Sequence, residues 1–196
     1  MTPRERRLRE LAERRQLILS TARELAEAEG WDAVTTRRLA DQIEYSQPVL
    51  YQHFKNKDAI VHAVALEGFA ELADALRRAR LEGGEDPVVA LRLAARAYLG
   101  FAAANPMLYQ AMFTLSAGLE FATEQTPQEM IDAFTELMSV VRPLVADQDA
   151  ELHTEVVWSA CHGLASLTRG ERLRPGLQEE RLTALVDRFV RSATPA

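Results

Sequence analysis

Cysteine is nearly absent from this chain: Cys161 is the only one among 196 residues, so no disulfide can form within the chain. Its neighbours are apolar or small, which is typical of a buried hydrophobic side chain rather than of a reactive thiol. No run of 18 or more apolar residues occurs, and the Arg- and Glu-rich N-terminus lacks the apolar stretch of a secretory signal. These absences predict a cytoplasmic protein that does not interact with a membrane.

The motifs of common enzyme chemistry are also missing. The sequence has no Gly-rich phosphate loop, no His-Glu-x-x-His and no pair of cysteines that would hold a metal. His153 and His162 lie nine residues apart, too far for a shared metal ion on one helix. We therefore predict no catalytic residue, no cofactor and no metal site, although an all-α enzyme stays open as an alternative.

Charge is unevenly distributed along the chain. Residues 1–60 carry 11 Lys and Arg against 10 Asp and Glu, whereas residues 61–196 carry 12 against 19, for a net charge of −6. Such a balance argues against a protein that coats nucleic acid without specificity. A near-neutral N-terminal part with a few cations is compatible with contact to a specific DNA site.

Apolar residues recur at helical spacing between sparse glycines and prolines, and no segment alternates as a strand would. We predict an all-α fold of about nine helices, with a domain boundary at the Gly83-Gly84-Glu85-Asp86 break. Residues 1–58 would form a three-helix headpiece, a helix over about 57–82 would connect, and residues 83–196 would form a larger helical domain. The predicted helices cover residues 4–29, 36–43, 47–53, 57–82, 88–102, 107–121 (one or two short helices), 130–141, 152–168 and 182–189.

Residues 31–58 predict a helix-turn-helix. Thr35 is a suitable N-cap for a first short helix and Ser46 for a second. Leu39 and Ile43 share one face of the first helix, and Leu50 and Phe54 share one face of the second, so the four side chains would hold the helices crossed. The second helix would then direct Gln47, Val49 and Gln52 outward, as a recognition helix requires. Pro48 is tolerated in the first helical turn.

These residues resemble the helix-turn-helix signature of the tetracycline-repressor (TetR) family. The similarity lies in Thr-Thr-Arg-Arg-Leu-Ala (35–40), then Ser46, then Leu-Tyr-x-His-Phe-x-x-Lys-Asp-Ala (50–59). Further on, Trp158-Ser-Ala-Cys-His162-Gly163 is similar to the Trp-x-x-x-His-Gly element of one C-terminal subclass, the Trp-His-Gly subclass. The resemblance implies a homodimeric, ligand-responsive transcription regulator that binds double-stranded operator DNA, more often a repressor than an activator.

The resemblance also implies which residues meet DNA. Base contacts would fall to four residues of the second helix, and Gln there is suited to adenine and an apolar side chain to a thymine methyl, which predicts A·T pairs in each half-site. Phosphate contacts position the protein without specifying sequence. The base-contact set is Gln47, Pro48, Val49 and Gln52, and the phosphate-contact set is Thr36, Arg37, Tyr51, His53, Lys55 and Lys57.

Simpler interpretations stay open for some of these residues. Tyr51 can instead cover the helix pair, and Lys55 and Lys57 can form a solvated helix start. The arginines at 4, 6, 7 and 9 are either a minor-groove arm or a solvated helix face paired with glutamates, and we favour the helix face.

The turn departs from the family pattern, because Glu44-Tyr45 replaces the usual Gly and aliphatic pair. A turn of the usual shape would require a left-handed Glu44, at a cost of about 1 kcal/mol.

The C-terminal helices carry many methionine and aromatic residues. Such residues are ordinarily core, and the family resemblance is what implies a pocket for a small, mostly apolar effector of unknown identity. His162 would donate or accept a hydrogen bond in this pocket, or else serve a structural role. The predicted pocket residues are Phe101, Tyr109, Met112, Phe113, Phe134, Met138, Trp158 and His162.

Residues 152–168 and 182–190 carry apolar side chains on more than one helical face, more than one intramolecular contact uses. This surplus predicts a two-fold, four-helix interface between two copies of the chain. A helical small-molecule-binding or partner-binding protein without specific DNA binding is the remaining alternative.

Overall fold

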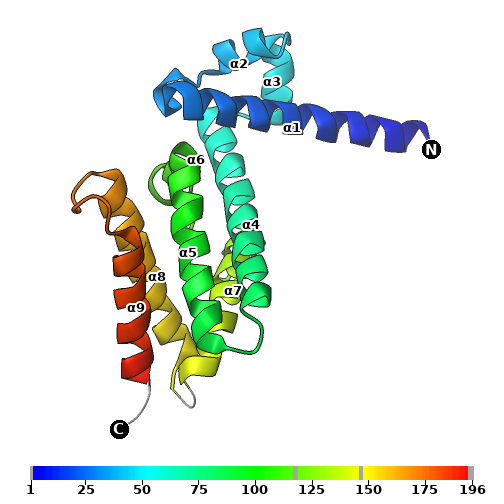
Figure 1. Cartoon of the computed structure of the whole chain (residues 1–196). Coiled ribbons are helices and arrows are strands. Elements are labelled where there is room, and N and C mark those ends of the chain that lie inside the picture. Colours follow the sequence, from blue (N-terminus) through cyan, green and yellow to red (C-terminus); the bar gives the residue numbers. More distant parts are fainter. Residues whose placement is uncertain (1, 117–118, 146–147, 194–196) are drawn as a thin grey trace. The chain divides into compact units, whose positions relative to one another are not determined.

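The computed structural model describes residues 2–116, 119–145 and 148–193 (Figure 1). Within these ranges the chain forms nine α-helices, one 3₁₀ turn and one π-helical segment, and no strand. The predicted all-α class is confirmed. The helices are α1 (Pro3–Glu29), α2 (Thr36–Gln42), α3 (Gln47–His53), α4 (Lys57–Gly83), α5 (Pro87–Ala104), α6 (Pro106–Gln110), α7 (Gln128–Val145), α8 (Ala150–Arg169) and α9 (Gln178–Ala193); the 3₁₀ turn is Trp31–Ala33 and the π-segment Ala111–Leu115.

The chain folds into two compact units. The first contains residues 1–68 and 105–119, and the second contains residues 69–104 and 120–196. This division groups residues 105–119 with the N-terminal part, whereas the sequence-based boundary placed them in the second domain. The predicted roles of residues 1–58 as the DNA-binding domain and of residues 83–196 as the effector-binding and dimerisation domain remain predictions.

In the first unit, α1 begins and ends at residues whose chemistry fixes those points. The Thr2 hydroxyl accepts from the Glu5 amide at 3.2 Å while the Glu5 carboxylate accepts from the Thr2 amide at 2.7 Å, which is a capping box. Gly30 ends the helix with φ 85°, a left-handed value that glycine adopts without strain. Residues 3–17 are exposed, and the buried residues of α1 all lie in its C-terminal half: Ile18, Leu19, Thr21, Ala22, Leu25 and Ala26.

The helix-turn-helix core forms as predicted. Leu39 and Leu50 are fully buried, and Ile43 and Phe54 are nearly so. The Thr35 hydroxyl accepts from the Arg38 amide at 3.2 Å and caps α2. Ser46 occupies the N-cap position of α3, but its side chain makes no capping hydrogen bond, so that part of the prediction is wrong. The backbone geometry of Pro48 in the first turn is enough to begin the helix.

The turn between α2 and α3 places Glu44 in the left-handed conformation that a turn of the usual family shape requires. Glu44 has φ 57°. The Tyr45 amide donates to the Ala40 carbonyl at 2.9 Å and the Glu44 amide to the Asp41 carbonyl at 3.4 Å, the two bonds of a Schellman motif. Glu44 therefore stands where glycine is the preferred residue, and the motif forms despite the Cβ.

Segment α6 is attached to α1 by side chains of the first unit. The Glu27 carboxylate accepts from the amides of Met107 and Leu108 at 3.2 and 2.9 Å, which satisfies donors at the start of α6 that have no helical partner. The Trp31 indole N–H donates to the Met107 carbonyl at 2.8 Å. These bonds explain why residues 105–119 group with the N-terminal unit.

In the second unit, α5 packs against α7, α8 and α9 (Figure 1). Its buried face is mostly alanine, and small side chains let the neighbouring helices approach closely. By length and composition α5 is also apolar enough to cross a membrane, a property that the core helix of a soluble protein shares. Its buried residues are Ala90, Leu91, Ala94, Ala95, Tyr98 and Ala102.

Two further contacts tie the second unit together. The Glu136 carboxylate on α7 pairs with Arg77 at 2.8 Å and with Arg80 at 3.1 Å, both on α4. The Trp158 indole N–H on α8 lies 3.1 Å from the Tyr98 hydroxyl on α5 and donates to it. Helix α7 continues past residue 141, where the predicted helix ends, and Pro143 lies inside its last turn.

Candidate functional site

The four predicted base-contact residues lie together on α3. Gln47, Pro48 and Gln52 are exposed and Val49 is half-buried, while Leu50 between them is fully buried. The buried Leu50 fixes the rotation of the helix, and the other side chains consequently face solvent. This arrangement leaves two amide side chains and two small apolar groups on one accessible helix surface.

Tyr51 and Thr36 form a polar pair at the edge of this surface. The Tyr51 side chain is 49% exposed, and its hydroxyl lies 3.4 Å from the Thr36 hydroxyl. Tyr51 therefore does not serve as a buried cover of the helix pair. Arg37, next to Thr36, is largely exposed, and its Nε lies 4.0 Å from an Asp41 carboxylate oxygen. Both hydroxyls and the guanidinium are accessible to an anion.

His53 lies at the end of α3, beside two arginines of α1. Burial lowers the pKa of its imidazole below the usual value, and the positive charges of Arg14 and Arg15 lower it further. The Arg15 guanidinium lies 4.4 Å from the centre of the Phe54 ring, and Arg14 lies 6.0 Å from the centre of the Tyr45 ring. These cation–π contacts hold two cations against the helix-turn-helix.

Arg14 and Arg15 also belong to this surface, although no pattern in the sequence predicted them. Both belong to a helix that ends well before the helix-turn-helix, and neither fits the motif of residues 35–59. No local spacing signals their proximity to His53, because that proximity arises only when α1 packs on α3.

The two predicted lysines differ. Lys55 is exposed. Lys57 is half-buried, and its ammonium group donates to the Trp31 carbonyl at 2.5 Å. Lys57 therefore links the start of α4 to the turn after α1, and it has two N–H groups left for another acceptor. Together the exposed groups around α3 offer cations and hydroxyls to phosphate, and amides and methyl groups to bases.

A separate cavity of about 270 Å³ lies in the second unit, between α7, α8 and the segment before α7. Two of the eight predicted pocket residues, Phe134 and Trp158, line it. Phe121 lies between Phe69 and Trp158, with ring centres 5.9 and 5.2 Å away. The remaining lining residues are Ala122, Thr123, Thr126, Met130, Ile131, Glu151 and Glu155.

The other six predicted pocket residues do not line this cavity. Tyr109, Met112 and Phe113 belong to the first unit, where Tyr109 and Met112 are buried and the rings of Tyr109 and Phe113 are 4.7 Å apart. Phe101, Met138 and His162 are half-buried in the second unit. The Met and aromatic residues thus divide between two packing regions, which helical spacing alone does not distinguish.

His162 and Cys161 are structural neighbours on α8. The His162 Nε2 lies 3.4 Å from the Ser166 hydroxyl. Burial, followed by the charge of Arg169, lowers the pKa of His162. Burial raises the pKa of the Cys161 thiol to about 12, so Cys161 is a packing residue, as its neighbours in the sequence predicted. In the described part of the chain, no group of three His, Cys, Asp or Glu is placed to hold a metal ion.

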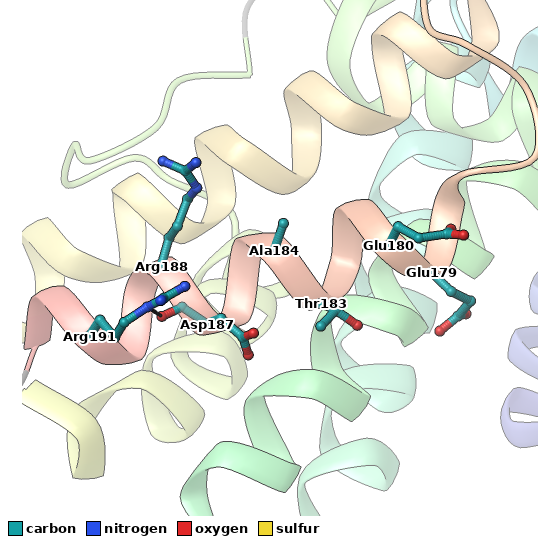
Figure 2. A pocket seen from close by; sticks show the side chains of 7 residues that line it. All are labelled: Glu179, Glu180, Thr183, Ala184, Asp187, Arg188 and Arg191. Carbon is teal, nitrogen blue, oxygen red and sulfur yellow. Dashed lines mark hydrogen bonds between the residues drawn. The ribbon is translucent and has the colours of Figure 1, made fainter.

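A second hollow runs along α9 and is lined mostly by residues with charged or polar side chains (Figure 2). Its lining comes from α9 alone, and Ala184 is its one apolar member. Several of its side chains bond to α5: Arg92 donates to the Thr183 hydroxyl at 3.0 Å, and Arg96 pairs with Glu179 at 2.5 Å. This charged helix face does not suit an apolar ligand. The lining residues are Glu179, Glu180, Thr183, Ala184, Asp187, Arg188 and Arg191.

Comparison with known proteins matches both parts of the chain. The family model for bacterial regulatory proteins of the tetR family matches residues 18–64. The model for the tetracyclin repressor-like C-terminal domain matches residues 91–193, about half of the chain. Assignment to the Trp-His-Gly subclass stays a prediction, because this C-terminal model carries no such description.

Individual relatives agree with the family models. The tetracycline repressor protein class C of Escherichia coli is 47% identical over 51 residues, which are 26% of this chain and 23% of that repressor. The chain thus spans about a quarter of the length of this curated relative. A solved structure of a protein with unknown function from Rhodococcus sp. RHA1 is 27% identical, with a TM-score of 0.76 over 91% of this chain and 94% of that one.

A TetR variant from Acinetobacter baumannii AYE, solved in complex with minocycline, has the same fold. It is 21% identical, with a TM-score of 0.62 over 91% of this chain and 97% of that one. Among the curated relatives, the tetracycline repressors and an HTH-type transcriptional repressor of Mycobacterium tuberculosis are named as transcription regulators, whereas SlmA of Vibrio vulnificus is named as a nucleoid occlusion factor. None of these is named as an enzyme. With a helix-turn-helix at residues 18–64 and a matching C-terminal domain, the chain belongs to the TetR family of bacterial regulatory proteins.

Proposed function

We propose that the protein is a ligand-responsive transcription repressor of the cytoplasm that binds a palindromic operator and is released by a small, mostly apolar effector. The observation that carries this proposal is the surface of α3. Its Gln47, Pro48 and Gln52 are exposed above a buried Leu50, beside hydroxyls and cations that suit phosphate.

In this proposal, Gln47, Pro48, Val49 and Gln52 contact base edges. A glutamine amide forms two hydrogen bonds with adenine, and a valine methyl packs on a thymine methyl. Thr36, Arg37, Tyr51, His53, Lys55 and Lys57 contact the DNA backbone. Arg14 and Arg15 add positive charge beside His53, and we include them among the residues that attract the phosphates.

We further propose that two copies associate through α8 and α9. Leu152, Val156 and Leu167 on α8 are about half exposed and recur on one helical face. On α9 the apolar face is already used within the protomer, because Leu182, Val186 and Phe189 are buried. The outward face of α9 is charged (Figure 2), so α8 would supply most of the apolar contact.

A symmetric dimer would present two recognition helices to successive major grooves, about 34–36 Å apart. We propose that an effector in the second unit favours a conformation in which the two recognition helices are no longer spaced to enter successive major grooves. Helix α4 contributes residues to both units as one continuous helix, so it is the element that would transmit the change. The loss of DNA affinity would equal the difference in the effector's affinity for the two conformations.

Selection of bound duplexes from a random DNA pool tests the proposal. Wild type and Tyr51→Ala are compared at two salt concentrations. Wild type should enrich a palindrome with A·T pairs in each half-site, and Tyr51→Ala should enrich it less. A regulator should also show a log–log salt slope of about −0.9 for each phosphate it neutralises. If wild type enriches no sequence at low salt, the protein is a DNA-independent ligand or partner binder.

Sedimentation of Val156→Glu tests the dimer. A carboxylate at the centre of the α8 stripe should dissociate the dimer, because it would bury an unpaired charge. The matched control is Thr168→Glu, which adds the same charge at an exposed position on another face of α8. A Val156→Glu protein that stays dimeric would reject α8 as the interface.

A further inference from the structure

We propose that the cavity beside α8 binds a cation, so that the effector is an aromatic or apolar molecule with one positive charge. This inference rests on the proposed ligand response and adds the class of ligand. It is carried by the position of two carboxylates at the edge of an aromatic-lined cavity.

Glu151, Glu155 and Trp158 follow one another at spacings of four and three on α8, so they lie on the same helical face. All three line the cavity. The side chains of Glu151 and Glu155 are exposed. Two like charges one turn apart repel each other, and a cation between them would relieve this repulsion.

The opposite walls of the cavity supply aromatic faces. The rings of Phe121 and Trp158 are 5.2 Å apart at an angle of 40°, and Phe134 lies on α7 across the cavity. Aromatic faces carry negative electrostatic potential, and tryptophan attracts cations most strongly. Met130 and Ile131 complete an apolar surface that a hydrocarbon part of the ligand can cover.

The charge of the surrounding segments also favours a positively charged ligand. Residues 119–141 and 148–168 hold no lysine and no arginine. Their acidic residues therefore give the cavity a negative surrounding potential, which attracts cations and disfavours anions. These residues are Glu120, Glu124, Glu129, Asp132, Asp149, Glu151 and Glu155, whereas the charge of Glu136 is balanced by Arg77 and Arg80 of α4.

The cavity volume of about 270 Å³ limits the ligand to a small molecule. The hydroxyls of Thr123 and Thr126 accept from the amides of Gln125 and Thr123, and each keeps an O–H that can donate to a polar group of the ligand. A compact quaternary or protonated amine attached to an aromatic ring fits the size, the aromatic lining and the two carboxylates.

The test uses two probes of nearly the same shape. Phenyltrimethylammonium carries a positive charge, and 2-phenyl-2-propanol is its neutral counterpart. Each is titrated into the full-length protein, and the two tryptophan indole N–H signals are followed by NMR. We expect the cation to bind about tenfold more tightly than the alcohol and to shift the Trp158 signal while Trp31 stays unchanged.

The variant Glu151→Gln/Glu155→Gln keeps the shape of both side chains and should lose this preference. The matched control Glu82→Gln/Glu85→Gln removes the same charge from exposed positions in the last turn of α4 and in the loop that follows it, and should keep the preference. Three results would overturn the inference. The first is equal affinity of the wild type for the two probes, and the second is a preference for the cation that survives in the Glu151→Gln/Glu155→Gln protein. The third is a shift of the Trp31 signal alone.

The same preparations are assayed for operator binding without any probe. DNA binding together with equal probe affinities would leave the proposed regulator intact and reject only the cationic ligand. Cation binding without DNA binding would support the cationic ligand and reject the proposed DNA-binding regulator. The two failures are therefore distinguishable.

Discussion

The hydroxyl oxygens of Tyr51 and Thr36 lie 3.4 Å apart and join α3 to the first residue of α2. Removing one hydroxyl leaves the helix-turn-helix core intact, because Tyr51 is half exposed. We expect Tyr51→Phe to lower operator affinity about fivefold, a loss of one hydrogen bond of about 1 kcal/mol.

The loss should be the same for all operator sequences, since a phosphate contact carries no sequence information. Fluorescence anisotropy with the selected operator and single-base variants measures this. Gln52→Ala serves as the contrast, because it should change the preferred base. Unequal losses for Tyr51→Phe across the operators would mean that Tyr51 reads a base.

His53 predicts a pH dependence of DNA binding. Burial and the charges of Arg14 and Arg15 lower its pKa in the free protein. A nearby phosphate would raise that pKa, so binding would take up a proton. Operator affinity should therefore increase as pH falls from 8, mostly below about 6.5, the ordinary histidine value. The logarithm of the association constant should rise by less than one per pH unit.

The control for this prediction is His53→Gln, which keeps a hydrogen-bonding group and should flatten the profile. An unchanged profile in the variant would assign the proton uptake to another group. The free protein should behave in the opposite way. Because the folded pKa of His53 is lowered, the unfolded chain binds more protons, and stability is lost as pH falls below about 6.5.

Glu44 predicts a stabilising substitution. It has φ 57° at the position of the Schellman motif where glycine has no Cβ penalty. Glu44→Gly should raise the free energy of unfolding by up to about 1 kcal/mol, after the greater chain entropy of unfolded glycine is subtracted. Glu44→Ala is the control, since it removes the carboxylate and keeps the Cβ. If urea unfolding shows the same change in the free energy of unfolding for both variants, the change is due to the lost charge and not to the backbone.

Cys161 predicts a thiol that does not react in the folded protein. It is 1% exposed, and burial raises its pKa to about 12. A disulfide reagent at pH 8 should modify the native protein at least about a thousandfold more slowly than the urea-unfolded chain, because only the thiolate reacts. Rapid modification under native conditions would show that α8 opens frequently.

Several features were predictable from the sequence because they depend on residues close together in the chain. Thr35 and Gly30 mark helix ends by local chemistry, and the spacing of Leu39, Ile43, Leu50 and Phe54 defines the helix-turn-helix core. The sequence left the shape of the turn at Glu44 open, and the structure shows that Glu44 is left-handed.

The composition of the cavity was only partly predictable. Phe134 and Trp158 were among the expected residues, but Glu151 and Glu155 were not, although they precede Trp158 on its own helical face. The two glutamates were not predicted to line a cavity, because a charged residue at a helix start is ordinarily solvated.

The sequence by itself determined the helices, the helix-turn-helix core and the family, since capping, breaking residues and helical spacing are local properties. Only the tertiary structure decided that Arg14 and Arg15 lie beside His53, that Glu27 holds α6 against α1, and which aromatic residues share a cavity. Those contacts join residues from different helices, and their formation depends on how the helices pack rather than on any repeat along the chain.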